Sequence, residues 1–175
     1  MPKNNSFITG KRILAVDDEP DVLEVIEEIL YEATLDKARN YDSAVKMLAA
    51  TAYDLAILDV MGVDGLKLLD ICVEKGIPAV ILTAHAMNVQ TFRAVVEKGA
   101  ISFLPKETMA DLDHFINKLI AAIESEKEPW KILFDEMAVY FDKKFGPAWK
   151  DENKMVWDEF THMVRSRHAK GCPSD

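Results

Sequence analysis

The sequence predicts an α/β fold in which a five-stranded parallel sheet is covered by helices on both faces. Two observations lead to this fold class. Five short apolar runs recur between residues 12 and 104, and apolar residues at helical spacing fill the segments between consecutive runs. Strands that alternate with helices favour a doubly wound parallel sheet, whose crossover connections are right-handed.

The expected strands are the five apolar runs, at residues 12–16, 35–39, 53–58, 79–82 and 100–104. Four of the intervening helices are indicated by apolar repeats, namely Val22, Ile26, Ile29 and Leu30; Ala44, Val45 and Leu48; Leu66, Leu69 and Val73; and Phe92, Val95 and Val96. A fifth helix is expected over about residues 110–125. Each helix presents one apolar face that can cover the sheet.

Residues with special backbone preferences mark the ends of several elements. Pro20 suits the first turn of a helix, where its missing N–H is not needed. Asp42 is the expected N-cap of the second helix. Gly76 and Gly99 stand where helices are expected to end, and Pro78 follows the first of them.

From about residue 125 the apolar positions become rich in aromatic residues, and two amphipathic helices are expected. The first ends at Gly146-Pro147, and the second covers about residues 151–167. This pair is too small for a core of its own, so it must pack on the α/β domain, on a second copy of the chain or on another protein. We therefore expect an N-terminal tail (1–10), an α/β domain (11–124) and an α-helical C-terminal extension (125–175).

The composition is that of a soluble globular protein. Of the 175 residues, 49% are hydrophobic and 29% are charged, and the net charge is −9. Such an acidic balance argues against nucleic acid or an anionic membrane as a partner. No apolar run approaches the length of a membrane span, and Cys72 and Cys172 lack metal-ligand or redox spacing. We therefore expect a cytoplasmic location, with Cys72 as a buried thiol.

Polar residues follow the predicted strands at their carboxyl ends, where parallel sheets bind ligands. Asp17 and Asp18 follow the first strand, Asp59 the third, Thr83 the fourth and Lys106 the fifth. Carboxylates crowded together repel one another unless a cation neutralises them, and Mg²⁺ suits an all-oxygen site of this kind. A carboxylate can itself accept a phosphoryl group, whose oxygens Mg²⁺ and a lysine ammonium would then neutralise.

Each of these residues also has an ordinary structural explanation. An Asp-Asp pair before a helix is usually a cap and a solvated charge. Asp59 alone could be a turn residue, Thr83 the end of a strand and Lys106 a solvated lysine. The order and register of all five together favour the functional interpretation.

With these residues placed, the chain resembles the receiver domains of two-component response regulators. The resemblance covers about residues 11–124 and rests on four segments: RILAVDDEP (12–20), DLAILD (54–59), AVILTA (79–84) and GAISFLPK (99–106). It implies the flavodoxin-like fold of the chemotaxis member, CheY, of this superfamily. It also implies phosphorylation of the chain by a sensor histidine kinase.

The resemblance implies a role for each site residue. Asp59 would be the phosphoryl acceptor, and Asp17 and Asp18 would hold Mg²⁺ together with Asp59 and the main-chain carbonyl of Met61. Thr83 would be the switch hydroxyl, Lys106 the phosphate-binding lysine and Phe103 the switch aromatic residue. Met61 and His85 occupy positions at which the family varies autodephosphorylation, and His85 is expected to be a surface histidine.

The sequence departs from the family pattern at two places. Met61-Gly62-Val63 leads directly to Asp64-Gly65, which makes the loop after Asp59 shorter than usual. Glu107 follows Lys106 where the family has proline, and Pro105 precedes it. We expect Lys106 to reach the site nevertheless.

The leading hypothesis is a phosphorylatable signalling switch that signals through protein contacts and is not an enzyme acting on external substrates. Two alternatives concern residues 125–175: a DNA-binding effector of a transcriptional regulator, and a constitutive dimerisation or docking module. The segment is nearly balanced in charge and lacks a helix-turn-helix with a basic second helix, which favours the dimerisation or docking module. A phosphatase or flavin-binding protein is disfavoured, because the first strand ends in Asp-Asp-Glu and not in a phosphate-cradling loop.

Overall fold

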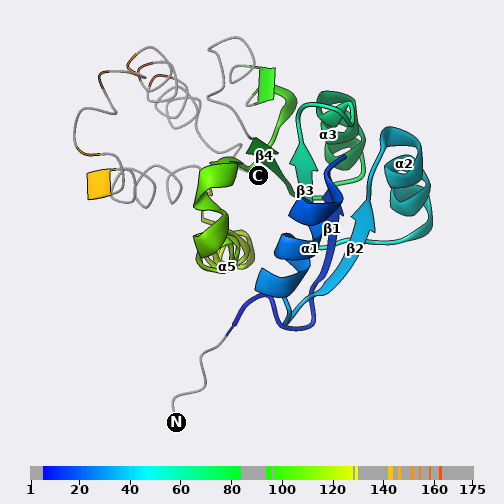
Figure 1. Ribbon diagram of the computed structural model, residues 1–175, viewed down its shortest axis with the longest axis horizontal. Coiled ribbons are helices and arrows are strands. Elements are labelled where there is room, and N and C mark those ends of the chain that lie inside the picture. Colours follow the sequence, from blue (N-terminus) through cyan, green and yellow to red (C-terminus); the bar gives the residue numbers. More distant parts are fainter. Residues whose placement is uncertain are drawn as a thin grey trace, which may run out of the picture.

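The computed structural model contains a five-stranded parallel sheet with helices on both sides (Figure 1). It describes residues 6–83, 94–95 and 97–127, together with residues 129, 142–143, 146, 151, 154, 158 and 162. The strands are β1 (Arg12–Val16), β2 (Thr34–Ala38), β3 (Leu55–Asp59), β4 (Ala79–Thr83) and β5 (Ser102–Pro105). Their spatial order, β2-β1-β3-β4-β5, is that of flavodoxin-like sheets and confirms the predicted fold class.

The helices of the described residues are α1 (Pro20–Ile29), α2 (Tyr41–Ala50), α3 (Gly65–Glu74) and α5 (Leu112–Glu124), and α5 is preceded by the 3₁₀-helix η1 (Lys106–Asp111). Figure 1 shows α1 and α5 on one side of the sheet and α2 and α3 on the other. Every residue of β3 and β4 is buried, as expected for central strands that are covered on both faces. Phe92, Val96 and His85 lie outside the described residues.

Local differences from the expected elements have identifiable causes. The N-cap of α2 is Asn40 and not Asp42, because the Asn40 backbone is extended and its side-chain oxygen accepts a hydrogen bond from the Ser43 N–H at 2.9 Å. In α3 the buried face is formed by Leu68, Leu69 and Cys72, whereas Val73 is 46% exposed. Cys72 is a free, buried cysteine, as predicted, and its burial raises the pKa of the thiol to about 11.

The segment before β1 is fastened to α5. The side-chain oxygen of Asn117 accepts hydrogen bonds from the backbone N–H groups of Phe7 and Ile8, at 2.7 and 3.3 Å. Ile8 is buried in the core, and the Lys11 ammonium lies 2.6 Å from a carboxylate oxygen of Glu124. Residues 7–11 are thus held against α5 at two places, in its middle at Asn117 and at its end at Glu124.

Helix α5 ends at Glu124, and its C-terminal end is capped by the residues that follow. Glu126 takes a left-handed backbone conformation (φ 56°), and the N–H of Lys127 donates to the Ala122 carbonyl at 2.8 Å. Most residues of the aromatic helices predicted for 125–175, Trp130 and Phe134 among them, lie outside the described residues, so these helices stay a prediction. In the described part of the chain, none of the helices has the length and apolarity to span a membrane.

Candidate functional site

Asp17 is the most enclosed acid at the carboxyl edge of the sheet. Its backbone N–H donates to the Ala38 carbonyl at 3.1 Å, which continues the pairing of β1 with β2 by one residue. Its Oδ1 accepts a hydrogen bond from the N–H of Glu19 at 2.9 Å, at the start of α1. The residue is only 1% exposed, so the backbone fixes both the position and the orientation of this carboxylate.

Lys106 supplies the positive charge of the site. Its Nζ lies 2.7 Å from Asp17 Oδ2, 3.5 Å from a carboxylate oxygen of Glu19 and 3.9 Å from Asp59 Oδ2. Burial alone would lower the pKa of this ammonium, but the contact with Asp17 and the charge of Asp59 outweigh burial and raise it. Lys106 is therefore a permanent cation that joins the ends of β1, β3 and β5, and the expectation that it reaches the site holds.

Asp59 ends β3 and is 5% exposed. Burial and the negative charge of Asp17 raise the pKa of its carboxyl from 3.8 to about 6, although Lys106 and a hydrogen bond from the Met61 backbone act in the opposite direction. Enclosure therefore makes ionisation of Asp59 less favourable than it is in water. The site would become more stable if a further cation entered it.

The acids around Asp17 form a group that could hold a metal ion. Ligand oxygens of Asp17, Asp18 and Glu19 lie within 4.8 Å of one another. Asp17 Oδ2 is buried, and although it is ion-paired with Lys106, the geometry does not provide a hydrogen bond to this oxygen from any described residue. A buried carboxylate oxygen without a hydrogen bond, within a group of three hard oxygen donors, fits a hard divalent cation.

Thr83 and Phe103 lie on the two strands beyond β3. Thr83 is the last residue of β4, is 5% exposed and pairs in register with Pro105 at the end of β5. Phe103 lies on β5 and is 8% exposed. Both side chains are therefore enclosed near the carboxyl edge that carries Asp59 and Lys106.

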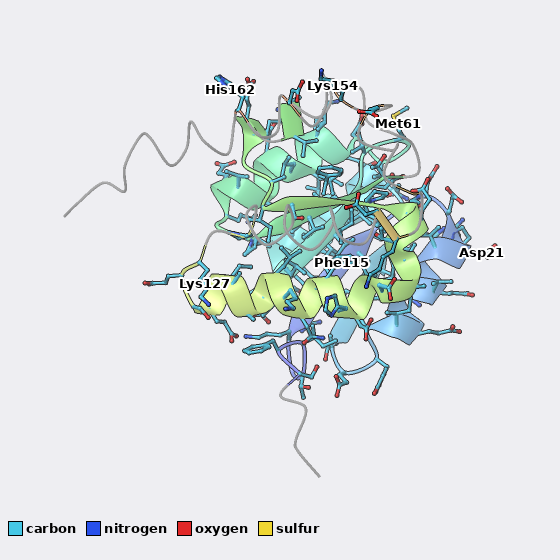
Figure 2. All side chains as sticks on the ribbon, turned by 90° about the vertical axis from the view of Figure 1, so that its left-hand side faces the viewer. Asp21, Met61, Phe115, Lys127, Lys154 and His162 are labelled. Carbon is cyan, nitrogen blue, oxygen red and sulfur yellow. The ribbon has the colours of Figure 1, made fainter. Side chains whose placement is uncertain are left out.

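The loop between β3 and α3 is compact. Gly65, the first residue of α3, approaches the end of β3 so closely that a Cβ there would lie 1.9 Å from the Asp59 carbonyl oxygen. Asp64 takes a left-handed conformation (φ 52°) at the N-cap. Met61 is 68% exposed, and Figure 2 shows its side chain at the periphery of the molecule. The shortened loop thus places the Met61 side chain in solvent, while its backbone contacts Asp59.

The turn after β5 is held by a residue that the sequence reasoning did not identify. Thr108 is fully buried, and its hydroxyl donates to the Pro105 carbonyl at 2.7 Å. No peptide bond among the described residues is cis, and the chain enters η1 directly at Lys106. The Thr108 hydroxyl therefore closes the turn that carries Lys106.

Glu19 is a second site residue that the sequence pattern does not single out. In the sequence it is only the last residue of the Asp-Asp-Glu run after the first strand, yet it contributes to the acidic group and contacts Lys106. Its adjacency to Asp17 and Asp18 was the available signal. Thr108 gave no comparable signal, because a threonine two positions after a lysine is common in any sequence.

Comparison with known proteins identifies the family of this chain. Residues 13–119 match the family model of the response regulator receiver domain. The chain is 36% identical over 107 residues to the nitrogen assimilation regulatory protein NtrX of Azorhizobium caulinodans, and 34% identical over 110 residues to the two-component response regulator ARR18 of Arabidopsis thaliana. These matches cover 57% and 59% of this chain, but only 23% and 17% of the two relatives.

Solved structures of receiver domains have a fold similar to that of this chain. A CheY-like receiver domain protein from Methanospirillum hungatei has a TM-score of 0.61 and 22% identity, over 67% of this chain and 99% of that one. The receiver domain of NtrX from Brucella abortus has a TM-score of 0.55 and 29% identity, over 62% of this chain and 96% of that one.

The chain belongs to the response regulator receiver domain family of two-component signalling. Receiver domains in these systems interact with sensor histidine kinases and are generally not enzymes. The DNA-binding and dimerisation alternatives concern residues 125–175, and a cytoplasmic location was inferred from the sequence alone, so these stay predictions.

Proposed function

We propose that this chain is a signalling switch in which Asp59 accepts a phosphoryl group from the phosphohistidine of a sensor histidine kinase, in a Mg²⁺-dependent reaction. The observation that supports this most directly is the meeting of two buried carboxylates and one partly buried ammonium group at one edge of the sheet. Lys106 Nζ lies 2.7 Å from Asp17 Oδ2 and 3.9 Å from Asp59 Oδ2. An acceptor carboxylate beside a fixed cation is what phosphoryl transfer requires, because charge develops on the transferred oxygens.

The proposed transfer is a displacement at phosphorus. An oxygen of the Asp59 carboxylate forms the new P–O bond while the P–N bond of phosphohistidine breaks. The departing ring nitrogen keeps the bonding electron pair, and a proton on the ring's other nitrogen leaves the imidazole neutral. Although burial raises the pKa of Asp59 to about 6, the carboxylate is still the major form at neutral pH.

The remaining residues have supporting roles in this proposal. Asp17 and Asp18, with Asp59 and the main-chain carbonyl of Met61, would hold Mg²⁺, which when bound neutralises part of the charge on the phosphoryl oxygens. Lys106 neutralises another part from the end of β5. Thr83 donates a hydrogen bond to the new group, and the rearrangement of Thr83 and Phe103 around it changes the face presented by the last helices of the domain.

Phosphorylation by a small phosphodonor tests the proposal without the cognate kinase. The full chain is incubated with acetyl phosphate and Mg²⁺, and its intact mass is measured. One added phosphoryl group is expected, which is lost in Asp59→Asn and in excess chelator but retained in Asp113→Asn, a matched removal of an exposed acid on α5. A wild-type chain that gains no phosphoryl group, or an Asp59→Asn variant that still gains one, would contradict the assignment.

A further inference from the structure

Gly62 lies directly against the carboxylate of Asp18. A Cβ at position 62 would stand 2.5 Å from Asp18 Oδ2, 2.7 Å from Asp18 Cγ and 3.1 Å from Asp18 Oδ1. These separations are shorter than any van der Waals contact. The loop after β3 and the carboxylate after β1 therefore share a space that only a residue without a side chain leaves open.

Asp18 has little else to hold it. Its side chain is exposed, in contrast to the buried side chain of Asp17. Within the described residues, no hydrogen bond or ion pair involves its carboxylate, whereas Asp17 has both Glu19 and Lys106. The backbone of Gly62 is therefore the surface that limits where the Asp18 carboxylate can lie.

The other glycines show that the close contact at Gly62 does not simply follow from a left-handed backbone conformation. Gly62, Gly76 and Gly10 all have left-handed backbones, with φ of 81°, 70° and 76°, and Gly76 and Gly10 would place a Cβ in open space. At Gly65 an added Cβ would meet the backbone of Asp59, which cannot yield. Among the glycines that the structure describes, only Gly62 would place a methyl group against the movable end of an acidic side chain, so the fold can absorb the change and Asp18 cannot keep its place.

We propose that Gly62 is a positioning residue of the metal site, which keeps the Asp18 carboxylate beside Asp17 by leaving room for it. The inference rests on the proposed function, in which Asp17 and Asp18 hold Mg²⁺. It adds Gly62, from the shortened loop after β3, as a position where an added side chain would lower the affinity for the metal while leaving the fold intact. Residues that orient metal ligands commonly change metal affinity by about 10- to 100-fold when they are replaced.

The test compares Gly62→Ala with Gly76→Ala in the full chain. Both substitutions place alanine at a left-handed position, so both are expected to lower the melting temperature by a similar few degrees. Mg²⁺ is titrated with amide chemical shifts as the readout. The dissociation constant for Mg²⁺ is expected to rise about tenfold in Gly62→Ala, which is the usual effect of replacing a residue that orients a metal ligand. It is expected to stay unchanged in Gly76→Ala.

A double-mutant cycle with Asp18→Ala identifies the route of the effect. In that background the atoms that the methyl group would meet are gone, so Gly62→Ala is expected to have no further effect on Mg²⁺ affinity. If Gly62→Ala folds only together with Asp18→Ala, the steric coupling is supported directly. If it folds in neither background, Gly62 serves the fold and the inference is overturned.

The proposed function and the inference about Gly62 are contradicted by different results. A wild-type chain without saturable Mg²⁺ binding overturns the proposed function and this inference together. A wild-type chain that binds Mg²⁺ through Asp18, with a Gly62→Ala variant that binds it equally well, overturns the inference alone.

Discussion

Replacing Asp59 by asparagine is expected to stabilise the metal-free protein. Folding raises the pKa of this carboxyl from 3.8 to about 6, mainly through burial and the neighbouring charge of Asp17. The folded chain therefore binds the Asp59 proton more tightly than the unfolded chain does. The contribution of Asp59 to the free energy of unfolding is therefore largest while this carboxyl is protonated. It is lost as the pH rises from about 4 through 6.

The size of the effect follows from the pKa. A rise from 3.8 to about 6 corresponds to about 3 kcal/mol of lost stability once the group is ionised. Asp59→Asn keeps the shape and removes the charge, so at pH 8 its free energy of unfolding should exceed that of the wild type by up to about 3 kcal/mol. For a chain of this size that is a rise of about 6–12 °C in melting temperature.

The assay is thermal or urea unfolding in excess chelator between pH 4.5 and 8, with Glu28→Gln, an exposed acid on α1, as the charge-matched control. The stability difference should shrink steadily as the pH falls below about 6, and Mg²⁺ should narrow it at pH 8. An Asp59→Asn chain that is no more stable than the wild type at pH 8, or a difference that does not depend on pH, would refute the reasoning.

Three further substitutions test other parts of the site. Lys106→Met leaves the buried Asp17 carboxylate without its cation and should lower the free energy of unfolding by about 3–5 kcal/mol. The control, Lys98→Met, breaks an exposed ion pair with Asp70 and should lower it by less than about 1 kcal/mol. Similar losses for the two variants in urea unfolding would contradict this prediction. Thr108→Val leaves the Pro105 carbonyl without its donor and should cost about 1–3 kcal/mol, with Thr108→Ser restoring most of the loss, as measured by urea unfolding. Gly65→Ala should prevent normal folding because its Cβ would overlap the Asp59 carbonyl oxygen, while Gly10→Ala should remain folded; circular dichroism of both variants decides.

The strands and the main site residues could be predicted because both follow from rules that operate along the chain. Apolar runs separated by helical repeats specify a parallel sheet, and a parallel sheet brings the residues after its strands to one edge. Asp17, Asp59 and Lys106 meet for this reason, although the first and last are far apart in sequence. The boundaries of the strands moved by one or two residues, and β1 was predicted without error.

What the sequence did not reveal depends on side-chain geometry. Asn40 and Asp42 are both acceptable N-caps by type, and the extended backbone at Asn40 decides between them. Val73 fits the apolar repeat of α3, but the rotation of the helix buries Cys72 in its place. The close approach of Gly62 to Asp18 brings together two loops that no sequence periodicity relates, so it follows only from the three-dimensional fold.

The attachment of residues 7 and 8 to Asn117 affects whatever follows α5 in the chain. Together with the ion pair between Lys11 and Glu124, it anchors the far end of α5 to the base of β1. The end of α5 is therefore held in place partly by residues more than a hundred positions earlier. Removing residues 6–11 would loosen this end of α5, so a truncation made to simplify the domain would also disturb the point at which the chain leaves the helix.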